Sequence, residues 1–132
     1  MEIKIRLNDH KYRYDVYQMF NIYFALDELK FVDDGEYIIN IEENKITFAF
    51  NGYYKESLIG ENIKEDIKRL VFESLKDITG EEHPWGILVG IRPSKIALKY
   101  LNEGKSNEEI VEIFKEKHLA AREKAELCIE VA

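Results

Sequence analysis

Residues 37–50 read YIINIEENKITFAF, in which apolar and polar side chains alternate on both sides of a short polar run. Alternation with a period of two is typical of strands that bury one face. A two-residue loop at Glu43-Asn44 joins the two strands into a β-hairpin. The predicted cross-strand partners are Ile41 with Ile46, Ile39 with Phe48, and Tyr37 with Phe50. This register places every large apolar side chain on one face, and a slip of one residue would expose them all.

The chain on either side of the hairpin adds further elements. Residues 3–7 alternate between apolar and charged side chains, which predicts a half-buried strand. Helical spacing of apolar and aromatic side chains predicts a helix over about residues 12–26, and residues 29–32 are expected to form a short second strand. Residues 63–78 have the pattern of a long amphipathic helix, with Gly80 placed to end it.

The C-terminal part of the chain is expected to be helical. Pro93 suits the first turn of a helix, and Gly104 suits its end. Ser106 and Glu109 have the spacing of a capping box, in which each side chain bonds the backbone N–H of the other. A last helix is expected from about Leu119.

The predicted order is therefore strand, helix, three strands and four helices. Strands followed by a run of helices favour the α+β class. We expect a small, mostly antiparallel sheet (β-α-β-β-β) covered by helices, with a C-terminal helical subdomain. The single domain then divides into a βαβββα unit at residues 1–80 and a helical subdomain at residues 81–132.

Composition limits the classes of function. A chain of 132 residues with 45% hydrophobic residues can bury a core, which argues against disorder. The formal charge of −7 argues against nucleic-acid binding through the overall field. The single cysteine, Cys128, excludes an internal disulfide or a multi-cysteine metal site, and its apolar helical stripe predicts a buried thiol. We find no signal sequence and no membrane-spanning run, and we expect a cytoplasmic protein without a membrane partner.

Catalytic and metal-binding patterns are weak. His10, His83 and His118 are scattered without ligand spacing, which favours structural or surface roles. Gly86 and Gly90 suggest a phosphate-binding loop, but the Gly-Lys-Ser/Thr step that such a loop needs is missing. No catalytic residue and no metal ligand is therefore predicted in this chain.

The segment from Trp85 to Lys95 is the strongest candidate for a functional surface. Residues 86–105 carry four basic side chains against one acidic side chain, which opposes the charge of the whole chain. Arg92, Lys95 and Lys99 gather at a helix start, where free amides and the helix dipole favour anions. Two interpretations remain open: Arg92 binds an anion or caps a neighbouring helix, and Trp85 anchors a partner or fills the junction between subdomains.

Residues 84–86 and 90–95 read Pro-Trp-Gly and Gly-Ile-Arg-Pro-Ser-Lys. They resemble the Pro-Trp-Gly-x-Leu-x-Gly-x-Arg-Pro-Thr/Ser-Lys signature of oxygen-independent coproporphyrinogen III oxidase-like radical-SAM proteins, also called coproporphyrinogen dehydrogenases. Residues 8–10 and 14–16 are similar to the start of these proteins, so the resemblance covers essentially the whole chain.

The resemblance implies a non-catalytic N-terminal accessory domain of an enzyme of haem and porphyrin biosynthesis. The [4Fe–4S] cluster and the S-adenosylmethionine of that family belong to a following barrel domain, whose cysteine triad this chain lacks. The expected partners are that radical-SAM barrel, within the same polypeptide, and a carboxylate-bearing substrate. The docking candidates are Trp85, Arg92, Ser94, Lys95 and Lys99. The alternative is a stand-alone module that binds protein or RNA through the basic start at Arg92–Lys95.

Overall fold

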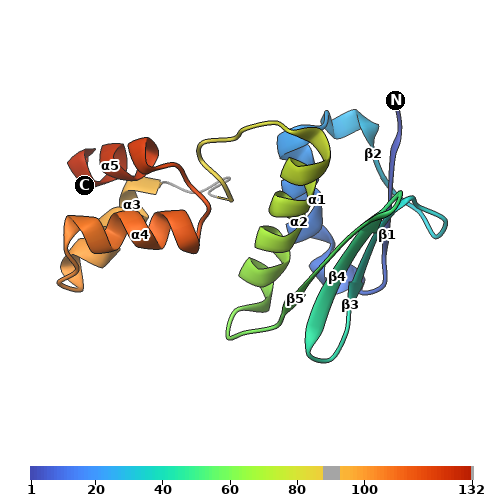
Figure 1. Ribbon diagram of the computed structural model, residues 1–132, viewed down its shortest axis with the longest axis horizontal. Helices are drawn as coiled ribbons and strands as arrows, with labels where there is room; N and C mark the ends of the chain where they lie inside the picture. Colours follow the sequence, from blue (N-terminus) through green and yellow to red (C-terminus); the bar gives the residue numbers. More distant parts are fainter. Residues whose placement is uncertain (88–92, 132) are drawn as a thin grey trace. The chain divides into compact units, whose positions relative to one another are not determined.

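The computed structural model describes residues 1–87 and 93–131. They form two compact units, Met1–Glu81 and Glu82–Ala132. The first unit contains a five-stranded sheet with two helices, and the second contains three helices within its described residues (Figure 1). The α+β class predicted from the sequence is confirmed.

The strands of the first unit run in the order β2-β1-β3-β4-β5. Their bounds are β1 Ile3–Leu7, β2 Leu29–Phe31, β3 Tyr37–Ile41, β4 Lys45–Phe50 and β5 Tyr53–Leu58. The sheet is mixed, because β1 lies parallel to both β2 and β3, whereas β3, β4 and β5 are antiparallel. The parallel pairing of β1 with β2 follows from the intervening helix, which carries the chain back across the sheet.

The hairpin of β3 and β4 has the predicted register. Ile39 pairs with Phe48 and Ile41 with Ile46. The Glu42 N–H donates to the Lys45 carbonyl at 2.8 Å, which leaves two residues in the loop. The rings of Tyr37 and Phe50 stack with their centroids 4.0 Å apart. The predicted apolar face is therefore built by direct cross-strand contacts.

The strand β5 was not predicted, so the expected β-α-β-β-β order is one strand short. Its half-buried positions are Tyr53, Lys55 and Ser57, which do not give the apolar alternation of an ordinary strand. The two residues between β4 and β5, Asn51 and Gly52, both have positive φ, at 43° and 86°. Asn-Gly is the strongest short-range hairpin signal, so this turn could have revealed β5.

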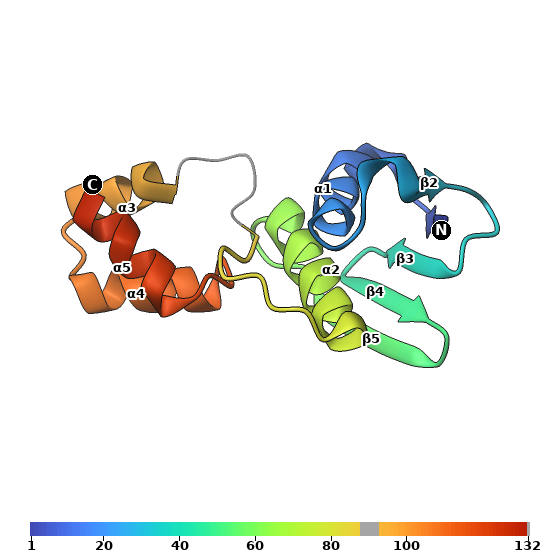
Figure 2. The ribbon, with the colours of Figure 1, turned by 90° about the horizontal axis from the view of Figure 1, so that it is seen from above.

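The helices α1 (Arg13–Tyr23) and α2 (Ile63–Thr79) cover the same face of the sheet (Figure 2). Both helices and the sheet contribute fully buried apolar side chains to the core between them. These are Val16, Met19 and Phe20 of α1, Ile67, Val71 and Leu75 of α2, and Ile5, Ile39, Ile46 and Phe48 of the strands. The helix α1 is shorter than expected, because short 3-10 turns at His10–Tyr12 and Leu26–Glu28 flank it. Gly80 ends α2 in the left-handed conformation, as predicted.

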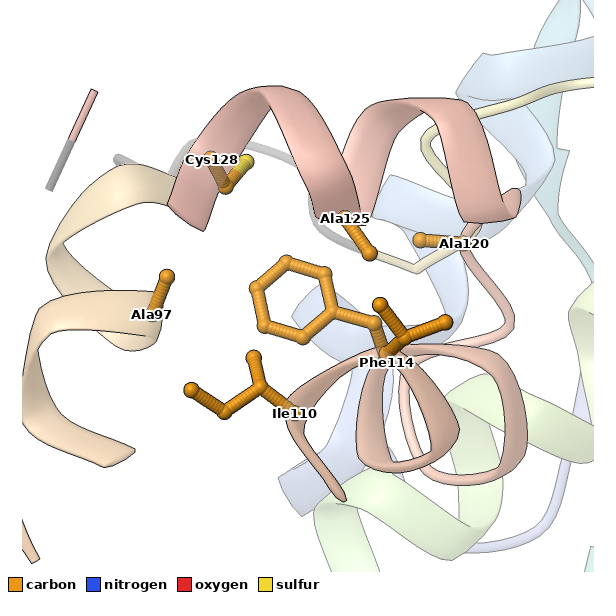
Figure 3. Packing of buried hydrophobic residues seen from close by; sticks show 7 residues of the cluster. Ala97, Ile110, Phe114, Ala120, Ala125 and Cys128 are labelled. Carbon is orange, nitrogen blue, oxygen red and sulfur yellow. The ribbon is translucent and has the colours of Figure 1, made fainter. Parts of the chain in front are cut away.

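The second unit contains α3 (Pro93–Asn102), α4 (Asn107–Glu116) and α5 (Arg122–Val131). The Phe114 ring lies between the helices, beside Ala97, Ala125 and Cys128 (Figure 3). The helices meet around seven buried residues: Ala97, Ile110, Val111, Phe114, Ala120, Ala125 and Cys128. We call this set the helical cluster. Small residues on α3 and α5 let both helices approach the large ring of α4.

The predicted helix ends of the second unit are largely confirmed. The Ser106 hydroxyl accepts from the Glu109 N–H at 3.2 Å, and the Glu109 carboxylate accepts from the Ser106 N–H at 3.0 Å. The helix α5 begins at Arg122 instead of Leu119. Leu119 has a φ of 56°, and the Ala120 N–H bonds the Phe114 carbonyl, so this stretch forms a turn before the helix.

Candidate docking site at the Pro84-Trp85-Gly86 segment

The Pro84-Trp85-Gly86 segment is attached to the turn between α4 and α5. The Ile87 N–H donates to the His118 carbonyl at 2.9 Å, and the Ala121 N–H donates to the Pro84 carbonyl at 2.6 Å. A further bond runs from the Gly86 N–H to the His83 carbonyl at 3.0 Å. These bonds pair backbone groups on both sides of Trp85, so the segment and the turn are held together.

Gly86 is required by this close approach. Its φ is 59°, and a Cβ at this position would lie 2.3 Å from the carbonyl oxygens of His118 and Leu119. Both neighbours are backbone atoms, which cannot move aside as a flexible side chain could. Glycine alone combines the left-handed backbone with the missing Cβ.

Trp85 packs against the helical cluster and keeps part of its ring accessible. Its side chain is half-buried against that cluster. The Lys124 ammonium lies 5.3 Å from the centroid of the indole, within the range of a cation–π interaction. Trp85 therefore has a packing role within the second unit. The Lys124 ammonium of α5 lies over its indole ring.

The remaining docking candidates lie at or near α3. Pro93 begins this helix, and Ser94 and Lys95 belong to its first turn. Arg92 lies outside the described residues, as does the motif stretch 88–91. Lys99 is exposed, with its ammonium 6.0 Å from the centroid of the neighbouring Tyr100 ring.

Sequence reasoning missed Lys124 and the turn at 118–121. Both contact the motif segment only after α4 and α5 have folded back onto it. No residue pattern near Lys124 marks it as a partner of Trp85. The left-handed φ of Leu119 likewise has no local signal, because leucine rarely adopts it.

The three histidines and the cysteine have distinct surroundings. His118 is buried, with its ring edge-on to Phe114 at a centroid distance of 5.7 Å. His10 is exposed, and His83 is half-buried. Cys128 is buried as predicted, and burial raises the pKa of its thiol. Within residues 1–87 and 93–131, no group of three histidine, cysteine, aspartate or glutamate side chains is placed to hold a metal ion.

A shallow pocket of about 390 Å³ lies between α4 and α5. It is lined by Asn107, Glu108, Val111, Arg122, Glu126, Ile129 and Glu130. The Arg122 guanidinium bonds Glu108 and Glu126, each at 2.7 Å, and these carboxylates raise its pKa. Because its one cation is already paired and its other charges are acidic, this pocket does not suit a carboxylate or a phosphate.

We compared the chain with known protein families, curated proteins and solved structures. No protein-family model, curated protein or solved structure matches the chain. The resemblance at residues 84–86 and 90–95 therefore stays a prediction. Among the described residues, no helix combines the length and the apolar character needed to cross a bilayer.

Proposed function

We propose that this chain is a non-catalytic accessory region of a radical-SAM protein that resembles oxygen-independent coproporphyrinogen III oxidase. In this role it docks, in the cytoplasm, onto the catalytic barrel of the same polypeptide. The observation that carries the proposal is that the described residues of the motif each have a structural role within the second unit. The Pro84 carbonyl is bonded, Trp85 packs on the helical cluster, Gly86 fits where a Cβ cannot, and Pro93 starts α3.

The proposal gives the motif a physical purpose. Hydrogen bonds that join Pro84 and Ile87 to the 118–121 turn hold residues 84–87 in one conformation, so docking of this segment carries little ordering cost. The exposed Lys99 of α3, with Arg92, Ser94 and Lys95 at the start of this helix, would contact carboxylates of the barrel or of a carboxylate-bearing substrate. The accessible part of Trp85 would add apolar contact area.

The chemistry of such a protein would reside outside this chain. A radical-SAM cluster needs three cysteine thiolates, and this chain has one cysteine, which is buried in the helical cluster. The residues present therefore do not fit a [4Fe–4S] cluster, and we assign no catalytic residue here.

The first test is the coding sequence beyond residue 132. We expect a Cys-x-x-x-Cys-x-x-Cys triad within a few dozen codons, followed by the strands and helices of a barrel. A stop codon directly after residue 132 would overturn the proposal.

The second test uses the full-length protein. Arg92→Ala and Lys99→Ala are expected to lower turnover or substrate affinity, while Lys115→Ala on α4 serves as an exposed lysine control. Equal turnover and equal affinity in all three variants would refute docking at α3. RNA binding by the isolated chain that weakens steeply with salt and is lost in Arg92→Ala would instead favour a stand-alone interaction module.

A further inference from the structure

The turn between β4 and β5 in the first unit carries a chemical feature that the proposed docking role does not use (Figure 2). Asn51 and Gly52 form this two-residue turn, which joins the paired residues Phe50 and Tyr53. Both turn residues have positive φ, at 43° and 86°, as in a type I′ turn. Asn51 is also the only asparagine of the chain that precedes a glycine. A side-chain amide is therefore followed directly by a backbone nitrogen that no side chain shields.

Both residues of this turn are open to water. Asn51 and Gly52 are exposed, and outside the neighbours of Gly52 in the chain no atom lies within 4 Å of the position that a Cβ would take there. Within residues 1–87 and 93–131, neither the Asn51 side chain nor the Gly52 N–H makes a hydrogen bond. A hollow of about 540 Å³, lined by Glu36, Phe50 and Asn51, lies beside the turn. Water can therefore reach both groups.

Asp34 and Gly35 form a second pair of this kind, and the structure protects it. The Gly35 N–H donates to the Val32 carbonyl at 3.4 Å. A Cβ on Gly35 would lie 2.7 Å from backbone atoms of β1, so the chain is closely packed there. An ionised carboxylate is in addition a poorer electrophile than an amide. The structure thus separates two pairs that look alike in the sequence.

We propose that Asn51 is a site of spontaneous modification, at which the side-chain amide is converted to isoaspartate with water as the co-reactant. The Gly52 nitrogen attacks the Asn51 side-chain carbonyl carbon and loses its proton. A C–N bond forms, the bond to the side-chain nitrogen breaks, and that nitrogen leaves with the proton as ammonia. Water then opens the five-membered succinimide at either carbonyl, which gives isoaspartate or aspartate. Nothing is oxidised or reduced, and ring closure is favoured because both reacting groups belong to one chain.

The fold controls this reaction and is changed by it. Ring closure takes the Asn51 backbone out of its left-handed conformation, so the Phe50–Tyr53 end of the hairpin has to open first. Among the described strands β5 is an edge strand that pairs with β4, and local opening costs least at such weakly held positions. Isoaspartate adds a backbone carbon to the turn, which a type I′ turn cannot accommodate. We therefore expect the modification to detach β5 from β4.

The test incubates the whole folded chain in mildly alkaline buffer and locates the modified residues by peptide mapping. A converted asparagine gains about one dalton, and enzymatic methylation of isoaspartate identifies the product. Asn44 is the matched internal control, because it is exposed in the two-residue turn between β3 and β4 but precedes Lys45. Asn51 should be converted at least about tenfold faster than Asn44. In the urea-unfolded chain, conversion of Asn51 should be faster still.

Trypsin tests the consequence for β5, because Lys55 becomes a substrate when this strand opens. Chains with isoaspartate at position 51 should be cut after Lys55 faster than unmodified chains from the same sample. Asn51→Asp carries the charge of the product without the additional backbone carbon, and it should be cut no faster than the unmodified chain.

Equal conversion of Asn44 and Asn51 would overturn the proposal, as would conversion of Asn51 in the unfolded chain alone. Equal cleavage after Lys55 in modified and unmodified chains would overturn the detachment of β5. The inference concerns the first unit and does not rest on the function proposed above, so neither result bears on docking at α3.

Discussion

Replacing Gly86 by alanine tests how the docking segment is held. The backbone at this residue has a φ of 59°, and an added Cβ would lie 2.3 Å from two carbonyl oxygens. The left-handed backbone costs a non-glycine residue about 1–2 kcal/mol. Relieving the overlap requires the segment to move away from the His118–Ala121 turn, which adds roughly 1–3 kcal/mol. We therefore expect Gly86→Ala to lower the free energy of unfolding of the second unit by about 2–5 kcal/mol.

Gly104→Ala is the matched control. Gly104 has a φ of 84° in the same unit, but no atom lies within 4 Å of the position that an added Cβ would take there. Gly104→Ala should therefore lower the free energy of unfolding only by the cost of the left-handed backbone, about 1–2 kcal/mol. Denaturant unfolding can be followed by the fluorescence of Trp85, the single tryptophan of the chain, which lies next to Gly86 and packs on the helical cluster. If Gly86→Ala lowers the free energy of unfolding no more than Gly104→Ala does, the close approach of Gly86 to the 118–121 turn is refuted.

Three further predictions address the caps, the edge strand and the thiol. Ser106→Ala removes the hydroxyl that accepts the Glu109 N–H, so urea unfolding should show a loss of about 1 kcal/mol, and an unchanged midpoint would contradict the capping box. Lys55→Met removes the 3.0 Å ion pair to Glu73, which is substantially exposed, and a double-mutant cycle should assign it less than about 1 kcal/mol. Because burial raises the pKa of Cys128, the folded state holds its proton above the ordinary value of 9.0, so stability is full below that pH and falls as the pH rises past it. The free energy of unfolding should fall less steeply with rising pH in Cys128→Ala than in the unchanged protein. The same fall with pH in both proteins would argue against a buried thiol.

The helices and strands whose apolar side chains recur at regular spacing were predictable from the sequence. The hairpin register followed from alternating apolar side chains, because one face had to be buried and a slip would have exposed it. The ends at Gly80, Pro93 and Ser106 followed from the chemistry of helix termini. These signals are local, so no knowledge of the tertiary fold was needed.

The edge strand β5 lacked such a signal. Lys55 occupies an inward position, where it pairs with Glu73 of α2 instead of packing as an apolar side chain. An inward-pointing charge on an edge strand also discourages pairing with another chain. The pattern that hid β5 from sequence reasoning is therefore a property of its position at the edge of the sheet.

Some features of the candidate site were likewise predictable from the sequence, and others were not. The sequence by itself determined that rare residues and cations gather between Trp85 and Lys99, where a helix begins at Pro93. Only the tertiary structure decided that Gly86 meets the turn at 118–121 and that Lys124 lies on Trp85. Periodicity and capping chemistry act within a few residues and leave a pattern in the sequence. Contacts between distant segments depend on how the helices and strands pack, and no local pattern encodes them.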